Sequence, residues 1–213
     1  MVKVSKEKIL KNIIDEVNSY VGSHFNNEDV TVNLAGSANN SYYWAKFLID
    51  SQVTSIAFSK IGIFLIAALL FRSILAGLFI VVPITFTTLF ISGAAGLMDI
   101  PLDVSTALAA GVAIGVGVDY AVHYLFKYRN VAAKGIVHYE ATLETMRSVG
   151  KTIVYNAIIV TAGFLVLLFS QFPPDVKLGG FVASYMIISC LAALILMPLM
   201  LSYSGTRNNA GPT

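Results

Sequence analysis

The sequence predicts an all-α polytopic membrane protein with five transmembrane helices, preceded by a small water-facing α+β unit. Hydrophobic residues make up 56% of the chain and charged residues only 12%, about half of the charged fraction usual in globular proteins. After residue 50 the chain consists largely of apolar runs, each near the ~20 residues that cross the hydrocarbon core of a bilayer. Short polar or basic stretches separate these runs, as expected of a multi-pass protein.

Residues 1–50 are predicted to form the water-facing unit. Apolar residues recur at helical spacing through residues 5–25, with charged residues between them, which predicts an amphipathic helix. Residues 30–36 (VTVNLAG) alternate like a short strand. A unit of this size buries too little surface to be stable alone, so we expect it to be the remnant of a larger domain.

The apolar runs predict five spans: residues 53–71, 75–97, 104–126, 152–170 and 178–201. Lys60 interrupts the first span, and Pro83 and Pro198 lie inside the second and the fifth. Prolines are tolerated in membrane helices because neighbouring groups satisfy the freed backbone atoms. The loop 127–151 contains a helical stretch, residues 137–149, which we expect to lie along the membrane surface.

Basic residues concentrate on one side of the predicted spans. The loop 127–151 carries several of them: Lys127, Arg129, Lys134, Arg147 and Lys151. Arg72 lies in the turn between the first two spans, whereas the loops on the other side hold only Lys177. Because basic loops stay in the cytoplasm, we expect the N-terminal unit outside and the tail 204–213 inside.

Several function classes are not expected from this sequence. The net charge is +2, and no cluster of lysines and arginines is arranged to follow a nucleic-acid backbone, so a nucleic-acid partner is not predicted. No hydrolase or metal-binding motif occurs, and His24, His123 and His138 fall in separate regions. We therefore expect neither an enzyme nor a cofactor or metal, and Cys190, the single cysteine, is predicted to be a packing residue.

The third predicted span carries a carboxylate near its middle, Asp119. An ionised aspartate at the centre of a membrane helix costs about 2.5–3.5 kcal/mol, so such residues face a bundle interior or a water path. One helix face would hold four residues spaced four apart: Gly111, Gly115, Asp119 and His123. The G-x-x-x-G spacing lets another helix approach closely, and Gly117 is a further small residue.

Asp119, Tyr120 and His123 are predicted to form a proton relay. A carboxyl inside the membrane can take up and release a proton, Tyr120 can donate a hydrogen bond to a carboxylate on a facing helix, and His123 can carry protons. The alternatives are a structural Asp119 and an interfacial His123. Tyr124 and Tyr128 are predicted to anchor the helix in the aromatic belt.

The stretch GVGVDYAVHYLFKYR resembles the fourth or tenth transmembrane helix of RND-superfamily transporters, in the branch of mycobacterial-membrane-protein-large (MMPL) exporters. Its G-x-G-x-D-Y motif is formed by Gly115, Gly117, Asp119 and Tyr120. Three further stretches are similar to the family in the same order: FRSILAGLFIVVPITFTTLFISGAAGLMDIPLD, TAGFLVLLFSQFPP and LGGFVASYMIISCLAALILMPLML. The resemblance covers residues 50–203.

The resemblance implies one half of an exporter, driven by the proton motive force, of lipids or other hydrophobic compounds in a bacterial or archaeal cytoplasmic membrane. Residues 1–50 would be the remnant of its porter domain. Asp119 would carry protons, Tyr120 would be its partner across the two halves, and Gly115 and Gly117 would allow close approach. Thr161 would be a hydroxyl near the relay. The implied partners are protons, a lipid or hydrophobic substrate, membrane lipids, and the other half or a second RND-type chain.

The sequence departs from the family pattern in two respects. It lacks the leading helix of a half and a second half, so we expect a C-terminal half that is a fragment or a split gene product. The alternative function is a lipid sensor like sterol-sensing domains, which resemble this superfamily, and which would bind lipid without pumping. The protein-translocation branch ranks third, because its fourth-helix motif differs.

Overall fold

The structure, a computed structural model, describes residues 2–25, 36–100 and 103–208. These residues form helices and no strand: α1 (Val2–His24), α2 (Ser37–Phe71), α3 (Ile74–Leu97), α4 (Val104–Ala132), α5 (His138–Leu165), the short 3-10 helix η1 (Val166–Phe169) and α6 (Pro173–Asn208). The predicted all-α class is therefore confirmed for the described part of the chain. The predicted helix at residues 5–25 corresponds to α1, and the predicted strand at 30–36 lies, except for Gly36, outside the described residues.

Five helical segments are long and apolar enough to cross a membrane: Phe47–Phe71, Ile74–Leu97, Val104–Ala132, His138–Phe169 and Pro173–Tyr203. This confirms the prediction of a multi-pass membrane protein with five spans. Pro83 lies inside α3 and Pro198 inside α6, and neither helix ends there. Both prolines are thus accommodated within continuous helices, as is common in membranes.

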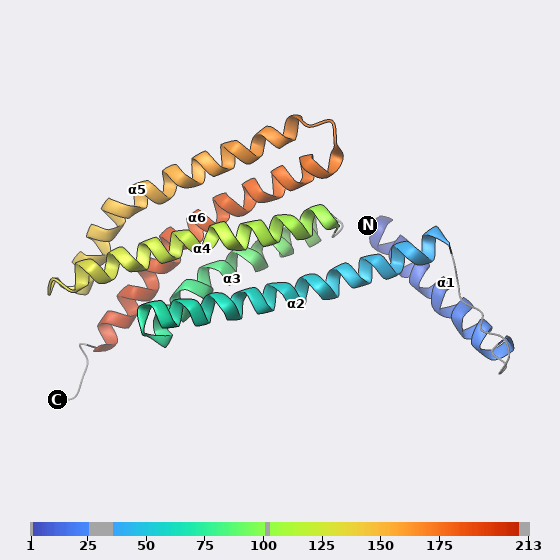
Figure 1. The fold of residues 1–213 in the computed structure, drawn as a ribbon, viewed down its shortest axis with the longest axis horizontal. Helices are drawn as coiled ribbons and strands as arrows, with labels where there is room; N and C mark the ends of the chain where they lie inside the picture. The colour runs from blue at the N-terminus through green and yellow to red at the C-terminus, as the bar shows by residue number, and fades with distance from the viewer. Residues whose placement is uncertain (1, 26–35, 101–102, 209–213) are drawn as a thin grey trace.

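The five helices form a half-open bundle rather than a closed one (Figure 1). Helix α6 packs against α3, α4 and α5, and α2 packs against α3 and α4. Helices α3, α4 and α6 bury about half of their most apolar segments, whereas α2 and α5 bury only 6% and 11% of theirs. The centre of the bundle is therefore α3, α4 and α6, with α2 and α5 at its two edges.

Two helices are longer than the sequence predicted. Helix α2 begins at Ser37 rather than near residue 53, so residues 37–50 of the expected water-facing unit continue directly into the first span. Helix α5 begins at His138 and runs without interruption to Leu165. The stretch 137–149 is therefore not a separate surface helix, because Ala141, Thr142 and Thr145 on its inner side are buried in the bundle.

The prediction that Tyr124 and Tyr128 anchor the helix in the aromatic belt is wrong. Their exposed fractions are 0% and 7%. The Tyr124 hydroxyl donates to the carbonyl of Thr142 at 3.4 Å, and the Tyr128 hydroxyl lies 2.8 Å from Nδ1 of His138. Both rings occupy the inner side of α4 because tyrosine placed there can satisfy its hydroxyl on α5. They hold the start of α5 against the end of α4.

Two side-chain contacts fix the ends of the helices. At the end of α2, Arg72 adopts the left-handed conformation (φ 48°) that closes the turn into α3. There Arg129 of α4 donates a hydrogen bond to the Phe71 carbonyl, and its guanidinium lies 5.4 Å from the centre of the Phe71 ring. At the opposite end of the bundle, Asp103 caps α4 and forms an ion pair with Lys177 of α6.

Candidate functional site

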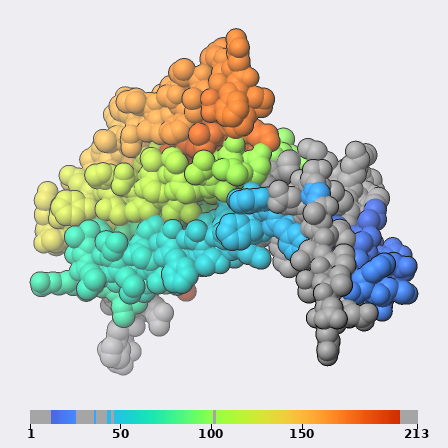
Figure 2. All heavy atoms as spheres, turned by 45° about the vertical axis from the view of Figure 1, so that its right-hand side comes forward, coloured from blue at the N-terminus to red at the C-terminus, as the bar shows by residue number. Residues whose placement is uncertain are grey.

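Helix α4 has one face that no described helix of this chain covers. Four residues on this open face are exposed: Gly111, Gly115, Asp119 and His123. A Cβ added at Gly111 or Gly115 would meet no atom within 4 Å. The space-filling view shows α4 at the surface between α5 and α2 (Figure 2). We call these four residues the open face.

Asp119 lies at mid-span on this open face. It is the 16th of the 29 residues of α4, counted from Val104. The helical spacing therefore places it on one stripe with both glycines and His123, as the sequence predicted. In this chain alone the carboxylate has room on its outward side, so a facing helix must come from elsewhere if lipid is to be kept away from it.

The opposite face of α4 packs inside the chain. Tyr120 is 1% exposed, and its hydroxyl contacts Sδ of Met186 on α6 at 3.8 Å. Gly117 is also buried, and a Cβ there would lie 2.7 Å from Oγ of Ser189 on α6. Gly117 thus provides a close helix approach, but the helix is α6 of the same half.

The placement of Tyr120 and Gly117 differs from the expectation that both serve contact with a second half. With 3.6 residues per turn, successive side chains are about 100° apart, so Tyr120 lies more than a quarter turn from Asp119. Gly117 lies about 200° round the helix from Asp119 by the same spacing. Within this chain the motif G-x-G-x-D-Y therefore supplies two faces, with Gly115 and Asp119 outward and Gly117 and Tyr120 inward.

Thr161 lies buried on α5 and makes no hydrogen bond to the other predicted relay residues. Its Oγ1 is the buried side-chain polar atom without a hydrogen-bond partner among the described residues. By contrast, Thr87, Thr88, Thr142 and Thr145 all donate to the carbonyl four residues earlier. The structure therefore does not join Thr161 to the open face.

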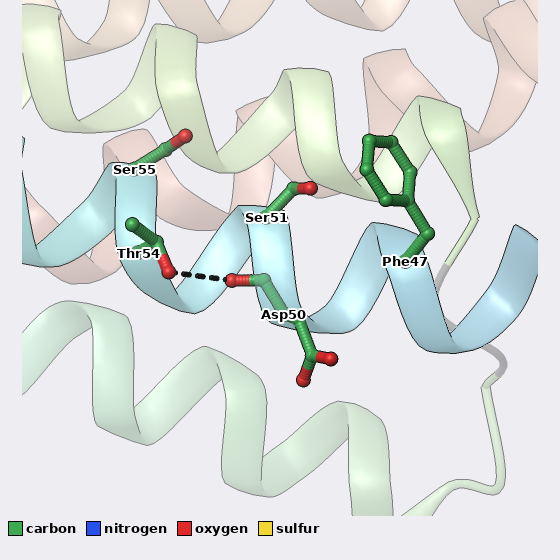
Figure 3. Close-up of a pocket in the computed structure, with 5 residues that line it drawn as sticks. All are labelled: Phe47, Asp50, Ser51, Thr54 and Ser55. Carbon is green, nitrogen blue, oxygen red and sulfur yellow. Dashed lines mark hydrogen bonds between the residues drawn. The ribbon is translucent and has the colours of Figure 1, made fainter.

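The N-terminal part of the α2 span contains a shallow hollow that the sequence reasoning missed. Its lining residues all come from α2: Phe47, Asp50, Ser51, Thr54 and Ser55 (Figure 3). The Thr54 hydroxyl donates to the Asp50 backbone carbonyl at 2.8 Å. The cluster of hydroxyl residues just inside an apolar span is the signal that could have revealed it. Since one helix supplies the whole lining, the hollow is open rather than enclosed.

Several known proteins are similar to this chain in sequence. The chain is similar to a membrane protein of Methanocaldococcus jannaschii, with 26% identity over 195 residues that cover 92% of this chain and 50% of the relative. Protein patched homolog 1 of Caenorhabditis elegans is 28% identical over 174 residues, 80% of this chain and 12% of the relative. The sulfolipid-1 exporter MmpL8 of Mycobacterium tuberculosis is 27% identical over 108 residues, 51% of this chain and 10% of the relative.

No solved structure matches the chain. The chain spans half of the length of the archaeal relative and about a tenth of the two longer relatives. The sequence model of the MMPL family matches residues 3–213. Because this match covers nearly every residue, the chain belongs to the MMPL family.

Proposed function

We propose that this chain is the membrane half of an exporter that uses the proton motive force to move lipids or other hydrophobic compounds. Its membership of the MMPL family supports a transporter rather than an enzyme. A relative named as a sulfolipid-1 exporter supports a lipid substrate. The basic residues near the ends of α2 and α4 support an orientation with these ends in the cytoplasm, and the archaeal and mycobacterial relatives support a bacterial or archaeal cytoplasmic membrane.

The observation that carries the proposal is the exposure of Asp119 at the middle of an apolar helix. A carboxylate facing hydrocarbon at this depth would cost about 2.5–3.5 kcal/mol or more. The glycines beside it leave a surface flat enough for a second helix to approach. Contact with such a helix shields Asp119 from lipid and leaves it able to take up and release a proton.

The partner on the open face is the other half of the transporter or a second RND-type chain. The length of the archaeal relative, of which this chain covers 50%, is consistent with two halves. Asp119 is the proton carrier in this proposal and His123, one turn away, passes protons toward the cytoplasm. Tyr120 supports Asp119 from the inner side of α4, through its packing against α6.

The proposal is tested by proton flux in vesicles. Purified protein is reconstituted with a pH-sensitive dye inside, an acidic exterior and a fluorescent phospholipid in the membrane. We expect proton entry and lipid redistribution for the native chain and for Glu144→Gln, an exposed residue of α5. Asp119→Asn should abolish both while the protein still inserts. Undiminished flux in Asp119→Asn would contradict the proposal.

Pairing through the open face is tested separately by cysteine cross-linking, in a Cys190→Ala background. Gly115→Cys should form disulfide-linked dimers if a second copy is the partner. Gly163→Cys is the matched control, because this glycine on α5 is also exposed with no atom within 4 Å of an added Cβ. Equal cross-linking at both positions would indicate random collision and would reject this face as the specific contact.

The second candidate is a lipid sensor that does not pump. The observation that favours it is the similarity to a patched protein over 80% of this chain, a longer match than that to the mycobacterial exporter. Lipid binding that is independent of pH and unchanged by Asp119→Asn, in vesicles that show no proton flux, would favour the sensor over the exporter.

A further inference from the structure

Lys60 occupies a position on the inward side of α2. The residues on the face of α2 that points toward the bundle recur every three or four positions: Ile56, Lys60, Ile63, Ala67 and Phe71. Ala67 and Phe71 are buried, and Ile56 and Ile63 pack against the core. Lys60 is partly buried, while the residues on either side of it are exposed. A lysine therefore replaces an apolar residue in the row that faces α3 and α4.

The contact between Arg129 and Phe71 sets the depth of Lys60 relative to Asp119. Helices α2 and α4 run in the same direction and lie side by side (Figures 1 and 2). Lys60 lies 11 residues before Phe71, about 16 Å at ~1.5 Å per residue, and Asp119 lies 10 residues before Arg129, about 15 Å. The two charged residues are therefore at nearly the same depth in the membrane.

The edge of α4 that faces α2 adjoins Asp119. Val118 and Val122 on this edge are partly buried and pack against the same core as Ile63. At about 100° per residue, Val122 lies about 60° from Asp119 round the helix, so the carboxylate lies next to the edge of α4 that faces α2. The long, flexible side chain of lysine can reach toward this edge.

We propose that Lys60 is the countercharge of Asp119: it pairs with the ionised carboxylate and is released when the carboxylate takes up a proton. The inference rests on the proposed function, since it specifies how the relay is balanced. In this half, whose open face is uncovered, the two side chains do not form an ion pair. A partner on the open face would exclude water from around these two side chains, and lower polarity strengthens attraction between opposite charges.

Among the described residues, α2, α3 and α6 offer Lys60 no carboxylate at its own depth. Lys60 is the one cation in the span Phe47–Phe71. The carboxylate of this span, Asp50, lies ten residues earlier, near the start of the span. Intramembrane charges are typically paired with one another or face a polar path. Proton uptake by Asp119 would then leave one net positive charge instead of a neutral pair, which couples protonation to a change in the packing of α2 against α4.

Other ionisable groups on the helices packed against α4 are placed differently. Helix α3 has none, and on α6 Tyr185 and Cys190 are buried in the bundle, while Asp175, Lys177, Tyr203 and Arg207 lie toward the ends of the helix. On α4 itself, Tyr120 is buried and His123 lies one turn away. Helix α5 carries seven ionisable groups: His138, Tyr139, Glu140, Glu144, Arg147, Lys151 and Tyr155. The contact of Tyr124 with Thr142 places Arg147 at nearly the depth of Asp119, but α5 packs on the buried side of α4 that carries Tyr124 and Tyr128, and Arg147 is exposed.

The protonation of Asp119 can be measured without any transport assay. Hydrophobic carbodiimides react with protonated carboxyl groups inside membranes, so labelling of Asp119 by dicyclohexylcarbodiimide is followed by peptide mass spectrometry across a pH series. A nearby cation favours the ionised carboxylate. Lys60→Met should therefore move the half-labelling pH upward by about one unit or more, whereas Lys60→Arg should leave it nearly unchanged.

The controls separate this pair from general effects. Lys134→Met, at the exposed turn between α4 and α5, should label like the native chain. An unchanged half-labelling pH in Lys60→Met would overturn the pairing even if Asp119→Asn abolishes transport. Conversely, a shifted pH in a protein that shows no proton flux would leave the pair intact and reject the exporter.

A proximity test covers the case in which Lys60→Met does not fold. In the Cys190→Ala background, Lys60→Cys combined with Asp119→Cys should be joined by a short bifunctional thiol reagent in native membranes. The pair Phe71→Cys and Arg129→Cys is the positive control, since these residues are in contact. Joining of the control pair but not of the pair at 60 and 119 would exclude the proposed contact.

Discussion

The two faces of α4 are built from the same kinds of residue but serve different neighbours. On the inner face, Gly117 and Tyr120 pack against Ser189 and Met186 of α6. On the open face, Gly115 offers the same small side chain with nothing opposite it, and Asp119 beside it is exposed. The helix is therefore fully packed on one side only. Its inner face has all its contacts within this chain, whereas the face that carries Asp119 has none.

The largest difference between the two faces is expected when one side chain is removed from each of them. Tyr120→Ala should destabilise the isolated half by about 3–5 kcal/mol, because it leaves a cavity against α6. Asp119→Ala should leave the stability of the half unchanged or raise it, since the exposed carboxylate packs against no described helix of this chain and its charge is costly in apolar surroundings. Thermal unfolding in detergent measures both, and equal losses would show that the faces do not differ as described.

Two matched glycine substitutions, one on each face of α4, test the same difference between the faces. Gly117→Leu should cost about 1–3 kcal/mol of stability, because the new side chain overpacks the contact with Ser189. Gly115→Leu should leave folding unaffected and reduce proton flux, since it fills the space kept for a partner helix. The measurements are thermal unfolding and the vesicle assay. Normal flux in Gly115→Leu would mean that no helix packs on the open face.

A smaller effect is expected where α4 contacts α2. Arg129→Met removes the hydrogen bond to the Phe71 carbonyl and the contact with the Phe71 ring. Because the arginine is exposed, we expect a loss of about 0.5–1.5 kcal/mol. Lys134→Met, at the neighbouring turn, serves as the control in thermal unfolding. A similar loss in both variants would assign the effect to net charge rather than to this contact.

The smallest expected effect concerns the ion pair between Asp103 and Lys177 at the N-terminal ends of α4 and α6. Burial opposes ionisation of Asp103, but hydrogen bonds from Lys177 and the backbone of Thr106, with the nearby positive charge, lower its pKa below the ordinary value. A depressed pKa in the folded state means that the stabilisation is present above pH ~4 and is lost as pH falls below it.

The variant Asp103→Asn tests this pH dependence while keeping a good helix cap. The side chains of Lys177 and Asp103 are 42% and 34% exposed, so screening by solvent limits the pair to about 0.2–1 kcal/mol. The gap in melting temperature between the native chain and the variant should be present at pH 6 and should close as pH falls through the lowered pKa. A constant gap would assign the effect to capping.

The sequence predicted the number and order of the spans because each is an apolar run bounded by polar residues. It also predicted that Gly111, Gly115, Asp119 and His123 share a face, since this follows from helical spacing alone. Which neighbour each face would meet could not be predicted, because spacing in one helix does not say where α6 lies. For the same reason Tyr124 and Tyr128 were assigned to the membrane interface, although their hydroxyls find partners on α5.

Helix α2 has a mechanical consequence that follows from its length. It is 35 residues long without interruption, or about 52 Å at ~1.5 Å per residue, and only its last 25 residues form the membrane span. An uninterrupted helix of this length would tilt as one unit about the tight turn at Arg72. Each degree of tilt about this turn would displace the far end by about 0.9 Å, so small rearrangements deep in the membrane are amplified beyond the surface without any hinge.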